Sequence, residues 1–298
     1  MAGFALALIK GLLLLSASLL CTALLLRWWL GVRPGLARLL TIVGGVLVVV
    51  FSFLDIWFTL QSVTGFVDRD LLLRYSNTTR HGTAVGWRTV LTVIFVVLAQ
   101  LPARRWVLGL LAPAWLLLLG TFSYTSHASA MAGTGALLLD WVHFLAGAAW
   151  IGIILTAGLA TDVWREQGAR LLRMMEAVST TGLVSVIMIL LSGFVSSLLH
   201  VAEPERFFGS PYSWALGVKI LLVLITVGIA AVNRFKFLPQ LRAAGDSSGL
   251  RRSLIIESIL LVAVFAATGV LTTSSLPHGE DFPGLQENVN RLLNHLWR

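Results

Sequence analysis

The sequence predicts an all-α, polytopic membrane protein: a bundle of about eight transmembrane helices with both termini on the periplasmic side. Of its 298 residues, 57% are hydrophobic and only 12% are charged, whereas soluble domains carry about 25% charged residues. Eight apolar runs approach the roughly 20 residues needed to cross about 30 Å of hydrocarbon. These runs are continuous instead of alternating, which favours helices over a membrane barrel.

The predicted spans divide the chain into two four-helix halves, residues 1–126 and 127–276, within one membrane domain, followed by an outer tail at 277–298. The tail either lies on the bilayer as a short amphipathic helix or caps the bundle. The first span resembles a signal peptide, but no small-residue cleavage site follows it, so we expect a retained helix. The polar segment 64–86 is expected to be the longest outer loop. The spans are 4–26, 37–62, 87–102, 106–126, 136–161, 176–200, 212–233 and 254–275.

Basic residues are concentrated in the loops that follow the first, third, fifth and seventh spans. Loops rich in Lys and Arg stay in the cytoplasm, so both termini are predicted to be periplasmic. The formal charge of +8 is explained by this rule and by attraction to anionic lipid, so no nucleic-acid partner is expected. The single cysteine, Cys21, lies in the first span and excludes a disulfide framework. The basic loop residues are Arg27, Arg33, Arg38, Arg104, Arg105, Arg165, Arg170, Arg173, Arg234, Lys236, Arg242, Arg251 and Arg252.

The histidines all fall on the predicted outer side, where they are candidates for a metal site. His127 follows the fourth span, and His200 ends the sixth. Asp140 and His143 are three residues apart near the start of the fifth span, which places them on one helix face. We expect these side chains to lie near one depth at the outer mouth. Imidazole binds copper, zinc, iron and nickel; Asp140 is either a ligand or the group that orients an imidazole.

The alternative for any single histidine is a ring that only meets interfacial water. We expect this of His81, His278 and His295.

Charged residues inside the spans are expected to pair, because an isolated charge there costs on the order of 3 kcal/mol or more. Asp55 and Lys219 both lie about 12 Å from the outer side. We predict an Asp55–Lys219 ion pair, with Lys10 as the rival partner for Asp55. The pair is either a structural strut or part of a cation path.

Near the cytoplasmic boundary, Glu257 is expected to pair with Arg234 or Arg251. No Walker, HExxH or GxSxG motif is present, so neither a nucleotide nor an enzymatic activity is expected.

The segment from Asp140 to Gly152, Asp-Trp-Val-His-Phe-Leu-Ala-Gly-Ala-Ala-Trp-Ile-Gly, resembles the signature of the bacterial copper-resistance protein D (CopD) family. Further blocks resemble the family in the same order, and the resemblance covers roughly residues 120–276. These blocks are Gly217-Val-Lys219, Ala231-Val-Asn233-Arg234-Phe, Leu238-Pro239, Leu250-Arg-Arg-Ser253 with Glu257, and Leu271-Thr-Thr273.

The resemblance implies an eight-helix inner-membrane protein linked to copper movement, working beside a separate periplasmic CopC-type copper-binding protein. It makes His127, Asp140 and His143 the copper-site candidates. Structural or gating roles are implied for Lys219, Asn233, Arg234 and Glu257. The segment lacks a methionine ladder, so Cu(I) and Cu(II) both remain open.

Three functions are consistent with these observations. The leading one is a copper-binding protein that captures the ion at His127, His143 and His200 and moves it from periplasm to cytoplasm. The second is an electron-transfer protein that holds haem between two histidines, such as His143 and His200. The third is a non-transporting assembly or scaffold protein for copper enzymes.

Overall fold

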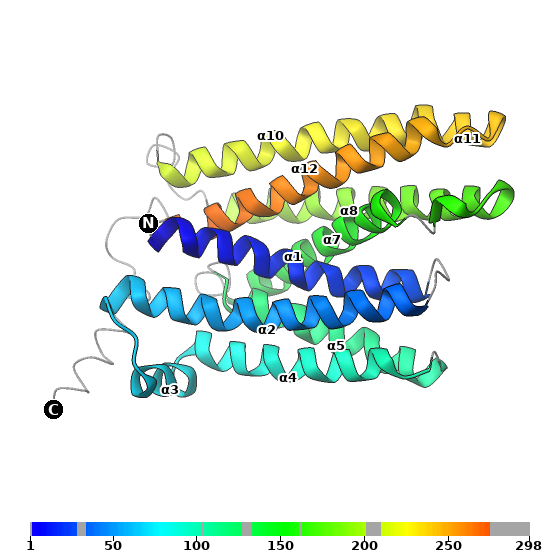
Figure 1. Ribbon diagram of the computed structural model, residues 1–298. Coiled ribbons are helices and arrows are strands. Elements are labelled where there is room, and N and C mark those ends of the chain that lie inside the picture. The colour runs from blue at the N-terminus through cyan, green and yellow to red at the C-terminus, as the bar shows by residue number, and fades with distance from the viewer. Residues whose placement is uncertain are drawn as a thin grey trace.

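The computed structural model describes residues 2–28, 34–102, 104–126, 133–160, 163–200 and 210–274, and within these ranges it is all-α. Eight of the described helices are long and apolar enough to cross a membrane, which confirms the predicted bundle. They run side by side, as Figure 1 shows. These helices are α1 (Ala2–Trp28), α2 (Pro34–Thr64), α4 (Arg80–Gln100), α5 (Arg105–Tyr124), α7 (Gly133–Leu159), α8 (Gly168–His200), α10 (Pro211–Val232) and α12 (Ser248–Thr273).

The polar segment expected to be a loop is largely helical. It forms the short helix α3 (Arg69–Thr78), and α4 begins at Arg80, seven residues earlier than predicted. Side-chain caps explain both starts: Asp68 accepts from the backbone N–H of Leu71 at 2.7 Å, and Thr79 accepts from that of Gly82 at 2.9 Å. Because α3 is polar on most of its surface, hydropathy alone did not reveal it.

Helix α1 joins the two halves of the chain. It packs along α2 and also against α7 and α12, so the halves share one bundle. The crossing with α12 is close at Gly269, where a Cβ atom would collide with the carbonyl oxygen of Ala7 and the backbone of Gly11. Small residues allow such close approach between membrane helices.

Helix α10 lies at the edge of the bundle and packs mainly on α12. It continues through a π-helical turn, η2 (Asn233–Phe237), into α11 (Leu238–Ala244). Pro239 has no N–H to donate to the carbonyl of Phe235, and the Leu238 N–H bonds to the carbonyl of Asn233 instead. The wider turn places Asn233 in the interior, with 7% of its surface exposed.

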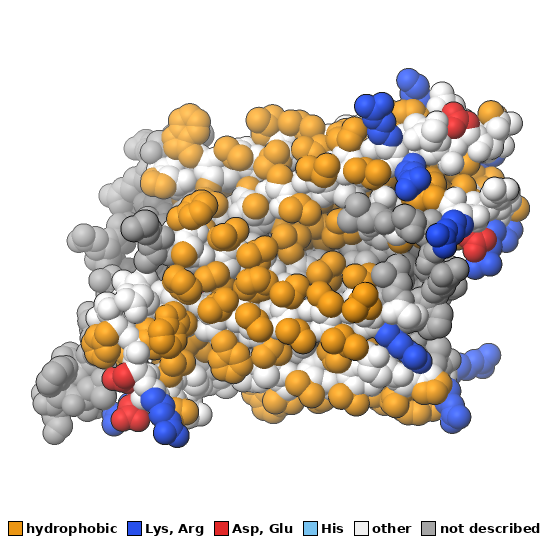
Figure 2. Space-filling view, in the orientation of Figure 1, with side chains coloured by type: hydrophobic (Ala, Val, Ile, Leu, Met, Phe, Trp, Pro, Cys, Tyr) orange, Lys and Arg blue, Asp and Glu red, His pale blue; other side chains and the backbone are white. Residues whose placement is uncertain are grey.

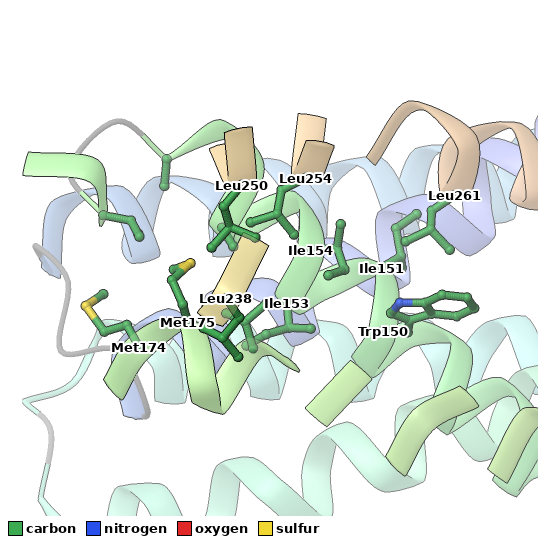
Figure 3. Packing of buried hydrophobic residues seen from close by; sticks show 14 of the residues in the cluster. Trp150, Ile151, Ile153, Ile154, Met174, Met175, Leu238, Leu250, Leu254 and Leu261 are labelled. Atoms are coloured by element: carbon green, nitrogen blue, oxygen red, sulfur yellow. The ribbon is translucent and has the colours of Figure 1, made fainter. Parts of the chain in front are cut away.

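The largest described core cluster lies where α7, α8, α11 and α12 meet. Figure 3 shows Ile154, Met175, Leu238 and Leu254 converging from these four helices. A 3-10 turn, η1 (Val163–Arg165), links α7 to the segment before α8.

The two ends of the bundle differ in charge. Figure 2 shows a hydrophobic belt with most of the basic side chains at one end and a smaller group of basic and acidic side chains at the other. We call the end with most of the basic side chains the basic end; it contains the last turn of α7, the helix α11, and the first turns of α5, α8 and α12. The opposite end, which carries α3, is called the α3 end. Alternate connections thus lie at opposite ends, as the distribution of Arg and Lys predicted.

Candidate functional site

His143 lies inside the bundle on α7, ten residues beyond Gly133. At 1.5 Å per residue, this is about 15 Å from the α3 end of the helix. Its Nδ1 lies 2.9 Å from the hydroxyl oxygen of Ser192 on α8. The ring packs against the backbone of Gly193, where a Cβ atom would lie 3.4 Å from its Cε1.

The Ser192 hydroxyl sets the protonation of this ring. The hydroxyl donates to the Met188 carbonyl, 2.5 Å away, and with the hydrogen there its oxygen accepts from His143. On this basis we assign the hydrogen of His143 to Nδ1 and the lone pair to Nε2. Metal-binding histidines commonly have this arrangement, in which one nitrogen donates to the protein and the other binds the ion.

Two charged side chains accompany His143. Lys219 of α10 acts electrostatically on the imidazole, and Asp140 of α7 acts on Lys219. Asp140 lies one helical turn before His143, as its spacing predicted. The structure therefore brings three of the candidate residues, Asp140, His143 and Lys219, into electrostatic range of one another.

The structure does not describe the side chains of the other two predicted histidine ligands. His127 lies outside the described residues. Helix α8 ends at His200, eight residues beyond Ser192, so the backbone of His200 is about 12 Å further toward the α3 end. His143 and His200 therefore do not share one depth, because the sequence places the ring partner of His143 two turns before the end of α8.

Within the described ranges, no three His, Cys, Asp or Glu side chains gather as a metal-binding group. Among the histidines whose side chains the structure describes, His81 is not available to His143 as a second haem ligand, since both of its ring nitrogens have partners at 2.9 and 3.0 Å.

Asp55 does not pair with Lys219. Its Oδ1 lies 3.6 Å from the Nζ of Lys10, and its Oδ2 lies 3.0 Å from the Nε2 of His81. The rival partner is therefore the observed one, because α1 packs along α2 while α10 lies on the far side of α12. The Asp55 side chain is only 4% exposed.

His81 is not solvated as expected, since its side chain is only 14% exposed. Its Nδ1 lies 2.9 Å from the Tyr75 hydroxyl, so the ring links α3 to Asp55. Burial, and then the charge of Asp55, raise the pKa of the Tyr75 phenol above its ordinary value. His278 and His295 lie outside the described residues.

Arg88 completes this cluster, and sequence reasoning missed it. It is fully buried on α4, donates from Nε to the Thr121 hydroxyl at 3.1 Å, and stacks on the Phe122 ring 3.9 Å from its centroid. Its charge also acts on Asp55. The available signal was an arginine inside an apolar run, where an ionisable side chain needs a partner.

Glu257 pairs with neither Arg234 nor Arg251. Its Oε1 accepts from the Trp150 indole at 3.0 Å, and its Oε2 accepts from the Asn233 amide at 2.7 Å. Arg234 instead donates to the Ser179 hydroxyl at 2.9 Å. The π turn explains the difference, because it brings Asn233 to the interior in front of the carboxylate.

Comparison with known proteins finds a family match in the second half of the chain. Residues 172–271 match the family model for copper resistance protein D (CopD). Inner membrane protein YebZ of Escherichia coli (strain K12) is 28% identical over 178 residues, which are 56% of this chain and 59% of YebZ. The chain thus matches less than two thirds of the length of that relative. No solved structure matches the chain significantly.

The matched segment runs from α8 to α12 and holds Ser192, Lys219, Asn233 and Glu257. It lies within the region whose motifs resemble the CopD family, and the eight apolar helices agree with the membrane placement of YebZ. The chain is therefore a multi-pass membrane protein whose residues 172–271 match the copper resistance protein D family model.

Proposed function

We propose that this protein binds copper inside the membrane at His143 and moves it from the periplasm to the cytoplasm. The observation that carries the proposal is the Ser192 hydrogen bond, which leaves the Nε2 lone pair of a partly buried imidazole available. Imidazole is a ligand for copper in either oxidation state. The CopD domain supports copper over the other ions that imidazole binds.

The charge distribution supports the orientation in the membrane on which this proposal depends. Because positive loops stay in the cytoplasm, the basic end faces the cytoplasm and the α3 end faces the periplasm. His127 and His200 belong to connections at the α3 end, where they would meet the ion first. His143 lies about 12 Å further in than the backbone of His200, and it would then be a second, deeper binding site for the ion instead of part of one shared site at the rim.

Asp140 and Lys219 determine the local charge around the proposed site at His143. A cation at His143 is opposed by the ammonium of Lys219 and favoured by the carboxylate of Asp140. Movement of Lys219 toward Asp140 would lower the barrier for the ion. A separate periplasmic CopC-type protein is the partner that would deliver copper to the α3 end.

The proposal is tested by copper uptake into proteoliposomes that contain a chromogenic copper chelator. Orientation is scored by protease access to a tag at the C-terminus. The variant His143→Ala is compared with His295→Ala, a histidine of the tail. We expect His143→Ala to lower bound copper and initial uptake by about tenfold or more, and His295→Ala to behave as wild type. Equal copper content and uptake in all three proteins would refute the His143 site. If the wild-type protein bound copper but the proteoliposomes that contain it took up none, the result would instead favour an assembly or scaffold role.

A further inference from the structure

A cavity of about 130 Å³ lies near the basic end, between α8 and α10. Its walls are mostly aliphatic, with Ile154, Met175 and Leu254 among them, and Figure 3 shows these three side chains close together. It is separate from His143, which does not line it. A cavity of this size, largely apolar and inside a membrane protein, suits a ligand that comes from the bilayer.

The cavity opens sideways toward lipid. Two of its lining residues, Leu183 on α8 and Phe235 on η2, are 40% and 76% exposed. Helices α8 and α10 contact each other only slightly. A molecule dissolved in the bilayer can therefore enter between these helices, beside the hydrogen bond from Arg234 to Ser179, two residues that also line the cavity.

The floor of the cavity carries hydrogen-bond acceptors. Glu257 is 1% exposed, and each of its oxygens already accepts one hydrogen bond, from Trp150 and from Asn233. Asn233 donates to Glu257 through its amide nitrogen, so its other side-chain atom, Oδ1, is available only as a hydrogen-bond acceptor. That oxygen is buried without a hydrogen-bond partner. An unpaired buried acceptor is unfavourable, and a ligand with a hydroxyl donor would satisfy it.

The size and chemistry of the cavity select one class of ligand. An apolar cavity of roughly 150 Å³ accommodates one benzene ring, and the thioether of Met175 makes favourable contacts with aromatic rings. A phospholipid acyl chain has no donor for Asn233. A phosphate group would be attracted by Arg234 but repelled by the carboxylate of Glu257, both of which line the cavity. We propose that this cavity binds the ring of a quinol-type amphiphile, whose hydroxyl donates to Asn233 and whose tail leaves between α8 and α10.

The experiment measures equilibrium binding of a tritiated decyl-benzoquinol, kept reduced, to the full chain in phosphatidylcholine nanodiscs. Its dimethyl ether, which has the same ring but no hydroxyl donor, is the matched ligand. Asn233→Leu removes the acceptor at similar volume, and Ala231→Phe fills the cavity. Ala215→Phe, on the same helix but away from the cavity, is the control variant.

We expect saturable binding of about one quinol per chain, weakened about tenfold or more by methylation of the hydroxyls or by Asn233→Leu. Ala231→Phe should abolish binding, and Ala215→Phe should leave it unchanged. Equal affinity for the ether and the quinol, or full binding by Ala231→Phe, would overturn the proposal. Displacement of the quinol by phosphatidylglycerol would overturn it in favour of lipid. The ligand pair needs no mutation, so the test is decisive even where a variant does not fold.

Discussion

The Nδ1 of His143 on α7 lies 2.9 Å from the hydroxyl oxygen of Ser192 on α8. We assign Ser192 as the acceptor, because its own hydroxyl donates to the Met188 carbonyl. A serine that bonds back to its own helix thus fixes the tautomer of a histidine on the neighbouring helix. The consequence is a lone pair on Nε2, inside the membrane, without a separate carboxylate to orient the ring.

Replacing Ser192 with Ala should weaken copper binding about 10- to 100-fold, the usual effect of losing the group that orients a metal-bound imidazole. The ring would no longer be held to one tautomer. Affinity is measured by competition with a chromogenic chelator. Ser185→Ala is the control, since Ser185 is also buried on α8, about two turns away. Equal affinities in the two variants would show that Ser192 does not orient the ligand.

Replacing Lys219 with Gln should strengthen copper binding at His143. Lys219 is the nearby positive charge that acts on this imidazole, and removing it removes a repulsion that is strong in a medium of low polarity. We expect an increase in affinity of roughly three- to tenfold. Uptake should slow, because a more tightly held ion leaves less readily. Lys236→Gln at the basic end serves as the control, and weaker binding in Lys219→Gln would contradict the proposed opposition of charges.

The helices could be predicted from the sequence because hydrocarbon demands long apolar runs, and the spacing of Asp140 and His143 placed both on one face. The partner of Asp55 could not be predicted in the same way. Lys10 and Lys219 lie at the same depth, so only the packing of α1 on α2 distinguishes them. Ser192 gave no signal, because serines in membrane helices commonly bond to their own backbone.

Two further errors arose from local structure that hydropathy does not report. His81 was expected in solvent because its segment is polar, but α3 folds over it and covers the ring. Glu257 was expected to meet an arginine, but the π turn before Pro239 presents Asn233 instead. In both cases a capping residue or a proline changed the backbone and thereby the partner of a buried polar group.

Replacing Asp55 with Ala should destabilise the protein by about 3 kcal/mol, the effect of breaking a buried ion pair from one side. The variant would remove the carboxylate that pairs with Lys10, contacts His81 and interacts with the charge of Arg88. Thermal unfolding in detergent measures the change. Asp70→Ala, an exposed carboxylate on α3, should be nearly neutral. Adding Lys10→Met to Asp55→Ala should recover part of the loss; no recovery would argue against the Lys10 pair.

The Tyr75 phenol should make stability depend on pH above about pH 10, its ordinary pKa. Since the folded protein raises the pKa of Tyr75, it holds the proton more tightly than the unfolded chain. This contribution to stability is fully present below pH 10 and is lost as pH rises further. The difference between the unfolding profiles of wild type and Tyr75→Phe isolates the effect. Tyr124→Phe, at an exposed tyrosine, should retain the wild-type slope, and a Tyr75→Phe profile parallel to wild type would contradict the prediction.

Replacing Gly269 with Ala should separate α1 from α12. The added Cβ would meet the carbonyl oxygen of Ala7 and the backbone of Gly11, neither of which can rotate away as a side chain can. Overpacking of this kind costs about 1–3 kcal/mol, although alanine is otherwise the better helix former by about 1 kcal/mol. Gly228→Ala on α10 is the matched control, because nothing lies within 4 Å of its added Cβ. We expect unfolding at lower denaturant for Gly269→Ala and at unchanged or higher denaturant for Gly228→Ala. If both variants were equally stable, the close contact between α1 and α12 would not hold the two halves of the chain together.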